Sequence, residues 1–111
     1  LMPEEHYLTI VNNNVTITKE FFDKDALIVE NSGIKKVSLS KDCEPVVEVM
    51  FNAPVFGLWS AAGKGVPFVC IEPWYGRTDA IDSDGSLDAR EWGNELAGGE
   101  TFTGGYRCKF L

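Results

Sequence analysis

The chain has 111 residues, of which 44% are hydrophobic and 24% are charged, and these values predict one globular unit with a single core over residues 1–111. The formal net charge of −7 comes from 17 acidic against 10 basic residues with no basic cluster, which argues against nucleic acid as a partner. No apolar run approaches the roughly 18–20 residues of a membrane-spanning helix and no signal-peptide pattern occurs, so we expect no membrane partner and a cytoplasmic location.

Short apolar, β-branched and aromatic runs alternate with turn residues, and no segment longer than about two turns has a helical period. This pattern predicts an all-β fold, an antiparallel β-sandwich. Turn residues such as Asn31-Ser32-Gly33 and Asn52-Ala53-Pro54 separate the runs. We expect strands at Tyr7–Val11, Val15–Thr18, Ala26–Glu30, Lys36–Leu39, Val46–Phe51, Val55–Ser60 and Phe68–Glu72.

The polar, acidic segment Arg77–Arg90 is expected to be a long loop, and loops of this length in compact domains are usually functional or disordered. After it, apolar and polar residues alternate from Phe102 to Phe110, which predicts a half-buried strand. Within that strand the pair Gly104-Gly105 predicts a bulge or a close approach of two backbone segments.

The three cysteines, Cys43, Cys70 and Cys108, are odd in number and widely spaced. They predict neither a disulfide framework nor a zinc site, and we expect no metal and no cofactor. Cys70 and Cys108 lie in apolar alternation, so we expect both to fill the core rather than to act as nucleophiles.

Glu72 is the residue that the pattern singles out for chemistry. A period of two places it on one face with Phe68 and Cys70, and Pro67 and Pro73 mark the expected ends of a central strand. A carboxylate where a buried strand emerges is partly desolvated, as a general base should be. The alternative is a carboxylate that only accepts hydrogen bonds from the backbone or from Arg77 at a strand end.

Trp74 and Tyr75 follow directly after this strand. Flat aromatic faces with an indole N–H and a hydroxyl are suited to the C–H faces and hydroxyls of a sugar ring, so Glu72 with these aromatics indicates a small-molecule sugar as ligand. In the alternative, aromatics beside proline and glycine serve as core or turn packing.

Four ordered segments carry a resemblance that covers nearly the whole chain: Phe21–Ile28, Phe56–Ser60, Pro67–Gly76 with Asp79, and Ala97–Phe102. In these segments the chain resembles the C-terminal part of the aldose 1-epimerase (galactose mutarotase-like) family. The resemblance implies that the chain is a C-terminal fragment of a large two-sheet antiparallel sandwich.

The same resemblance implies that Glu72 is the catalytic glutamate, which removes the proton of the anomeric hydroxyl. Trp59, Trp74, Tyr75 and Asp79 are the expected substrate-binding residues. Mutarotation also needs an acid on the ring oxygen. The family's acid is a histidine from a region N-terminal to the matched part, and His6 matches none of its positions, so we expect this chain alone to be inactive. The segment Arg90–Asn94 departs from the family pattern, which leaves its contacts in doubt.

Other functions remain open. The chain could be a non-catalytic carbohydrate-binding or assembly module that uses the same aromatics. A sugar-phosphate epimerase is a further alternative, but the chain has no basic cluster for a phosphate beyond Arg77, Arg90 and Lys64, which equally fit scattered surface charges. The acidic loop partly fits a calcium-binding EF-hand template, but Ala80 supplies no ligand at its first place and no helix is predicted beside it. Because half a sandwich leaves open sheet edges and an uncovered apolar face, we also expect self-association. The carboxylates of the acidic loop that match the EF-hand template are Asp82, Asp84, Asp88 and Glu91.

Overall fold

The structure is a computed structural model that describes Glu5 and residues 7–111. The described residues form six strands and no helix, which confirms the all-β prediction. Consequently this part of the chain contains no helix that is long and apolar enough to cross a membrane. The strands are β1 (Leu27–Glu30), β2 (Lys36–Lys41), β3 (Glu44–Phe51), β4 (Val55–Trp59), β5 (Cys70–Trp74) and β6 (Tyr106–Phe110).

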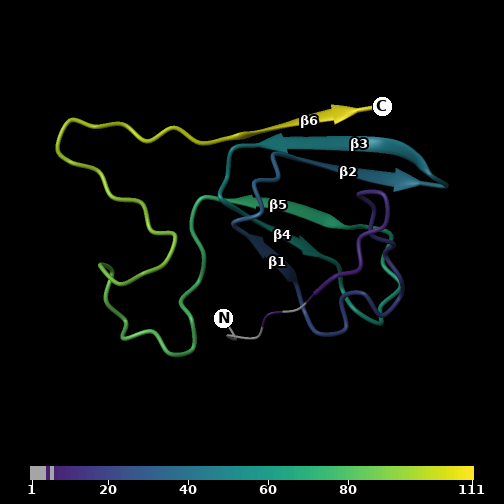
Figure 1. The fold of residues 1–111 in the computed structure, drawn as a ribbon, viewed down its shortest axis with the longest axis horizontal. Coiled ribbons are helices and arrows are strands. Elements are labelled where there is room, and N and C mark those ends of the chain that lie inside the picture. Colours follow the sequence, from purple (N-terminus) through teal and green to yellow (C-terminus); the bar gives the residue numbers. More distant parts are fainter. Residues whose placement is uncertain (1–4, 6) are drawn as a thin grey trace.

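The six strands form two antiparallel sheets that lie one above the other (Figure 1). One sheet has the order β1-β4-β5 and the other has the order β2-β3-β6. The short link of residues 52–54 carries the chain from β3 in one sheet to β4 in the other. A long excursion without regular structure, residues 75–105, then separates β5 from β6. Two stacked antiparallel sheets are consistent with a β-sandwich.

The core lies between the two sheets where β3 and β4 meet. Val49 and Phe51 from β3 pack with Ala53 and with Phe56 from β4, and all four are at most 5% exposed. The rings of Phe51 and Phe56 are 5.3 Å apart between centroids. Because the cluster draws residues from both sheets, it is the contact that holds the sheets together. Partly buried side chains surround it: Val29, Val37, Leu58, Ile71 and Tyr75.

The N-terminal segment differs from the prediction. Neither Tyr7–Val11 nor Val15–Thr18 forms a strand; a single antiparallel bridge joins Val11 to Asn14. Tyr7 is 92% exposed, so apolar residues here have no sheet face of the described chain to cover. A pattern of residue types predicts a strand only where a neighbouring strand supplies the hydrogen bonds. His6, to which we assign no role, lies outside the described residues.

The predicted strand Phe68–Glu72 is displaced toward the C-terminus. β5 begins at Cys70 and continues through Pro73, which pairs with Phe56, to Trp74. The expectation of a central strand is wrong for the described residues, because β5 lies at the edge of its sheet. This position also explains why Pro73 does not end the strand, since an edge strand can do without one N–H group.

The last strand is shorter and more exposed than predicted. β6 begins only at Tyr106, and all its residues are exposed, including Cys108, so the prediction that Cys108 fills the core is wrong. Cys70 is only half-buried. The reason for the exposure of β6 is its edge position beside β3. Gly104-Gly105 precedes the strand, so the bulge predicted within the strand does not form; the group that approaches the pair is a side chain, because a Cβ on Gly104 would lie 3.1 Å from the Tyr75 ring.

Candidate functional site

The register of the β1-β4-β5 sheet decides which way Glu72 points. Residues that are directly opposite on neighbouring strands share a face, and Glu72 lies opposite Gly57, which lies opposite Ile28. The flanking pair Leu58 and Ile71 lies on the other face and packs on the core. Glu72 therefore lies on the face turned away from the second sheet, which we call the outer face.

Trp74 shares the outer face with Glu72, two residues along β5, and its ring folds back over Gly57. A Cβ on Gly57 would lie 2.9 Å from Cζ2 of Trp74, so the absent side chain is what makes room for the indole. In this position Trp74 Nε1 donates a hydrogen bond of 3.2 Å to Glu72 Oε2. Glu72 is half-buried as predicted, but it lies in the middle of an edge strand and not at the end of a central one.

Trp59 lies on the same outer face, because it is the partner of Cys70 across β4 and β5. Its ring packs against Phe68 with 5.9 Å between centroids, and Ser60 Oγ holds that segment by donating to the Phe68 carbonyl at 2.7 Å. Glu72 is the diagonal neighbour of Trp59, at a separation that large side chains can span. The predicted residues Trp59, Glu72 and Trp74 thus share one face.

Tyr75 points away from this face. Its hydroxyl donates to the Gly105 carbonyl at 2.8 Å and accepts from the Gly105 N–H at 3.0 Å. Its ring stands edge-on to Phe102, with 5.4 Å between centroids. These contacts fasten the approach to β6 onto the end of β5. A role for Tyr75 in substrate binding stays a prediction, and its geometry favours the packing alternative.

Tyr75→Phe is expected to destabilise the fold by about 0.5–1.5 kcal/mol, because the hydrogen bonds to Gly105 are lost while the ring stays in place and water can reach the exposed Gly105 groups. Amide hydrogen exchange at Gly105 should accelerate, and urea unfolding should report the lost stability. Tyr106→Phe is the matched control, since Tyr106 is 68% exposed. Equal stability of the two variants would show that the Tyr75 hydroxyl does not fasten the loop.

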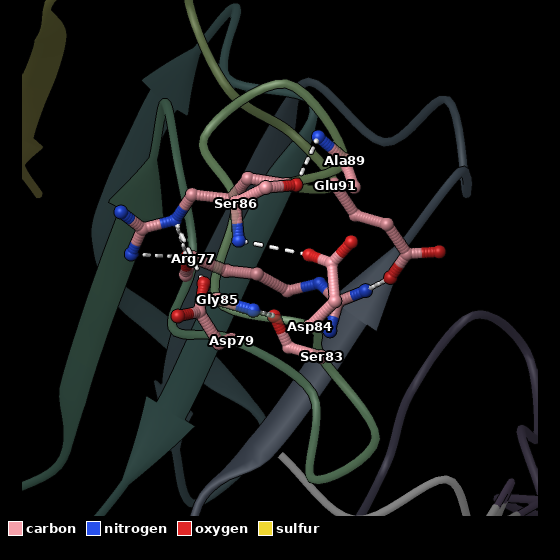
Figure 2. A network of polar contacts seen from close by, with 9 residues as sticks. Arg77, Asp79, Ser83, Asp84, Gly85, Ser86, Ala89 and Glu91 are labelled. Atoms are coloured by element: carbon pink, nitrogen blue, oxygen red, sulfur yellow. Dashed lines mark hydrogen bonds and ion pairs between the residues drawn. The ribbon is translucent and has the colours of Figure 1, made fainter.

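The loop after β5 is held to the outer face by Arg77, whose side chain is only 6% exposed. Arg77 Nε lies 2.7 Å from Glu30 Oε1, at an angle that makes an ion pair rather than a hydrogen bond. On the other side the guanidinium contacts Glu91, further along the same loop (Figure 2). Arg77 therefore neutralises Glu30 and Glu91, and Trp74, rather than Arg77, is the donor to Glu72.

Asp79 lies in the same loop and pairs with Arg90, whose Nε is 3.1 Å from Asp79 Oδ1. The Arg90 guanidinium also donates to the Arg77 carbonyl at 3.2 and 3.3 Å. Asp79 lines an open hollow of about 340 Å³ within the loop, and neither Glu72 nor Trp74 lines it. Arg77 and Arg90, two of the three basic residues considered for a sugar phosphate, both contact acidic side chains.

A second open hollow, of about 640 Å³, borders Trp74. Its lining includes Trp92 and Asn94, which the sequence did not single out as site residues. Asn94 Nδ2 donates to the Tyr75 carbonyl, and Trp92 has a positive φ of 59°. A tryptophan beside Gly93 in a polar loop was the only available signal. The complete lining is Trp74, Gly76, Arg77, Thr78, Leu87, Arg90, Trp92, Gly93 and Asn94.

The acidic loop does not gather its carboxylates. Among the described residues there is no group of three or more His, Cys, Asp or Glu side chains that could hold a metal ion. Glu91 contacts Arg77, and Asp84 Oδ1 accepts the Ser86 N–H at 2.8 Å in a local turn (Figure 2). The partial EF-hand pattern thus corresponds to a loop closed by its own backbone.

The Ser86 backbone N–H and then the Ser86 hydroxyl lower the pKa of Asp84 from its ordinary value of 3.8. Because the folded pKa is below the unfolded one, this turn contributes stability above the unfolded pKa and loses it as the pH falls through the folded pKa. An NMR titration of the Asp84 carboxyl should give a midpoint below 3.8. In Ser86→Ala the backbone donor remains, so the midpoint should rise only in part. An unshifted midpoint in the original chain would contradict the turn.

Gly57→Ala is expected to displace the Trp74 ring and break its hydrogen bond to Glu72, at a cost of about 1–3 kcal/mol in stability. The indole N–H resonance of Trp74 should shift, and urea unfolding should report the lost stability. Gly98→Ala is the control, because a Cβ there meets nothing within 4 Å. If the Trp74 resonance is the same in both variants, the ring does not depend on Gly57.

No family model, no curated protein and no solved structure matches the chain.

Proposed function

We propose that this chain is the C-terminal, carbohydrate-binding part of an aldose 1-epimerase (mutarotase), with Glu72 as general base. In this proposal its two sheets belong to the larger galactose mutarotase-like sandwich. The observation that carries it is the row of Trp59, Glu72 and Trp74 on the outer face, with the Trp74 indole hydrogen-bonded to the carboxylate. Aromatic side chains that share a sheet face with a carboxylate suit a pyranose ring.

The two oxygens of Glu72 have different surroundings. Oε2 accepts the Trp74 N–H, which fixes the orientation of the carboxylate. Oε1 has no partner among the described residues, so it is the oxygen that can take a proton from the anomeric hydroxyl. Loss of that proton, with protonation of the ring oxygen by an acid, breaks the bond between C1 and the ring oxygen; rotation of the aldehyde and the reverse transfers then give the other anomer.

No histidine is among the residues that the structure describes, and in the family resemblance the acid is a histidine outside the matched part. The chain in this proposal supplies the base and the aromatic contacts, and another region supplies the acid. The substrate is a small sugar, a hexose such as glucose or galactose. Neither Arg77 nor Arg90 supports a phosphate on it, because both pair with carboxylates.

A non-catalytic sugar-binding module is the second candidate, and the Trp74–Glu72 hydrogen bond also favours it. A carboxylate held in one orientation is a good acceptor for a sugar hydroxyl whether or not it removes a proton. The two candidates differ in what happens to the sugar after it binds.

Polarimetry on freshly dissolved α-glucose and α-galactose tests the proposal. The full product of the gene should accelerate mutarotation, whereas residues 1–111 alone should leave the spontaneous rate unchanged and still alter their tryptophan fluorescence when sugar is added. A sugar-binding module would change fluorescence in both cases and accelerate nothing. If neither sugar changes the rate or the fluorescence, both candidates are wrong.

A further inference from the structure

The strand β6 has one side free. Within the described part of the chain it pairs only with β3, and Figure 1 shows it at the outer edge of its sheet. Leu111 N–H donates to the Val46 carbonyl at 3.1 Å, just beyond the last ladder pair. Hydrogen-bonded pairs alternate along an antiparallel ladder, so the residues between them, Tyr106, Cys108 and Phe110, turn their N–H and C=O groups to the free side.

The side chains of β6 alternate in the same way. Tyr106 and Phe110 lie on the face that carries the core residues Val49 and Phe51 further in, yet they are 68% and 84% exposed. Arg107 and Lys109 lie on the other face. The edge therefore combines unpaired backbone groups, an uncovered apolar face and a positively charged face.

The neighbour that β6 already has shows what such a strand accepts. β3 places Val47 and Val49 opposite the apolar positions of β6. Opposite the basic positions it has Met50 against Arg107 and Glu48 against Lys109, but the Glu48 carboxylate pairs with Lys36 at 3.1 Å. β3 therefore matches the apolar face of β6 and leaves its basic face open to a further acidic strand. Opposite charges on directly opposed residues stabilise a pair of strands, and like charges destabilise it.

We propose that the free edge of β6 binds an extended strand of another polypeptide in which acidic residues alternate with apolar ones. Its acidic side chains lie opposite Arg107 and Lys109, and its apolar side chains cover Tyr106, Cys108 and Phe110. The main-chain groups supply hydrogen bonds, and the side-chain pattern supplies selectivity.

A second copy of β6 does not meet this requirement. In an antiparallel pair centred on Cys108, Arg107 of each copy lies opposite Lys109 of the other. A shift of the centre by one residue in either direction places Arg107 opposite itself or Lys109 opposite itself. Each of these registers opposes like charges. The net charge of −7 makes this basic strand the exception in an acidic chain, so charge complementarity selects an acidic strand from elsewhere.

The test uses two labelled peptides and fluorescence anisotropy with the full chain. The first peptide, Val-Val-Glu-Val-Glu-Phe, has the β3 pattern with a second glutamate; the second has lysine in place of both glutamates. The acidic peptide should give a saturable titration with a Kd at least about tenfold lower than that of the basic peptide. Added salt should reduce the ratio of the two Kd values. Equal binding of the two peptides would overturn the proposal.

Two variants locate the binding. Cys108→Pro removes an N–H that points to the free side and leaves the β3 ladder intact, so circular dichroism should be unchanged and peptide binding lost. The double variant Arg107→Glu/Lys109→Glu should reverse the preference between the peptides, which decides the matter if Cys108→Pro does not fold. Lys41→Glu, on β2 at the opposite edge of the sheet, is the control and should change nothing. Peptide binding that survives Cys108→Pro would place the peptide elsewhere on the protein. A dimer that this variant abolishes would assign the edge to a second copy of the chain. Either result would overturn the proposal.

Discussion

Glu72→Gln is expected to lower the rate of mutarotation by the full gene product by about 10²- to 10⁴-fold, the usual contribution of a positioned general base. Glutamine has the same shape, and its amide oxygen can still accept the Trp74 N–H that Glu72 Oε2 accepts. It cannot take up a proton at neutral pH. Polarimetry should therefore show the loss, while sugar affinity, followed by tryptophan fluorescence, should change much less.

Glu44→Gln is the matched control for this experiment. Glu44 is an exposed glutamate at the start of β3, in the other sheet, and the same chemical change there should leave the rate unaltered. A normal rate in Glu72→Gln would remove this residue as the base and leave it as a hydroxyl acceptor. A rate lost together with sugar affinity would point to the binding face as a whole rather than to proton transfer.

Phe56→Ala is expected to cost about 3–5 kcal/mol of stability. Phe56 is 4% exposed and packs on Phe51 across the space between the two sheets. Its removal leaves a cavity at the contact that joins β4 to β3. Since small domains have a stability of about 5–15 kcal/mol in total, the variant should be close to unfolding. Urea denaturation followed by circular dichroism measures the change.

Phe110→Ala removes the same side chain from an exposed position on β6, where Phe110 is 84% exposed. Its effect on stability should stay within about 0.5 kcal/mol. If the two phenylalanine variants unfold at the same urea concentration, the cluster of Phe51 and Phe56 does not hold the sheets together.

The local pattern of apolar residues was sufficient to predict the strands that lie beside the core. Val46–Phe51 and Val55–Ser60 were predicted close to their observed bounds, because Val49 and Phe56 are buried and their periodicity follows from that burial. It failed at Tyr7–Val11 because residue types do not report whether a partner strand exists. The sequence also does not reveal that β5 and β6 are edge strands: both contain apolar residues, yet among the described residues each has a neighbouring strand on one side only.

The site could be predicted in part. Period two on one strand places Glu72 and Trp74 together, and it also separates Tyr75 from them. The register between β4 and β5, which brings Trp59 to the same face, cannot be obtained from either strand alone. The position of the Trp74 ring could also have been predicted from Gly57. A glycine inside an apolar strand indicates that another group approaches the backbone closely, and here that group is the Trp74 indole.

Pro73, inside the edge strand β5, has a consequence for how the protein behaves at high concentration. A proline is tolerated there when its nitrogen, which carries no hydrogen, faces the side without a partner. A strand arriving beside Glu72 would miss a donor at that point, and prolines at edges are one of the means by which sheets resist templated growth. The edge next to the carboxylate is thus poorly suited to seed fibrils, and the flank of Glu72 stays open to small solutes.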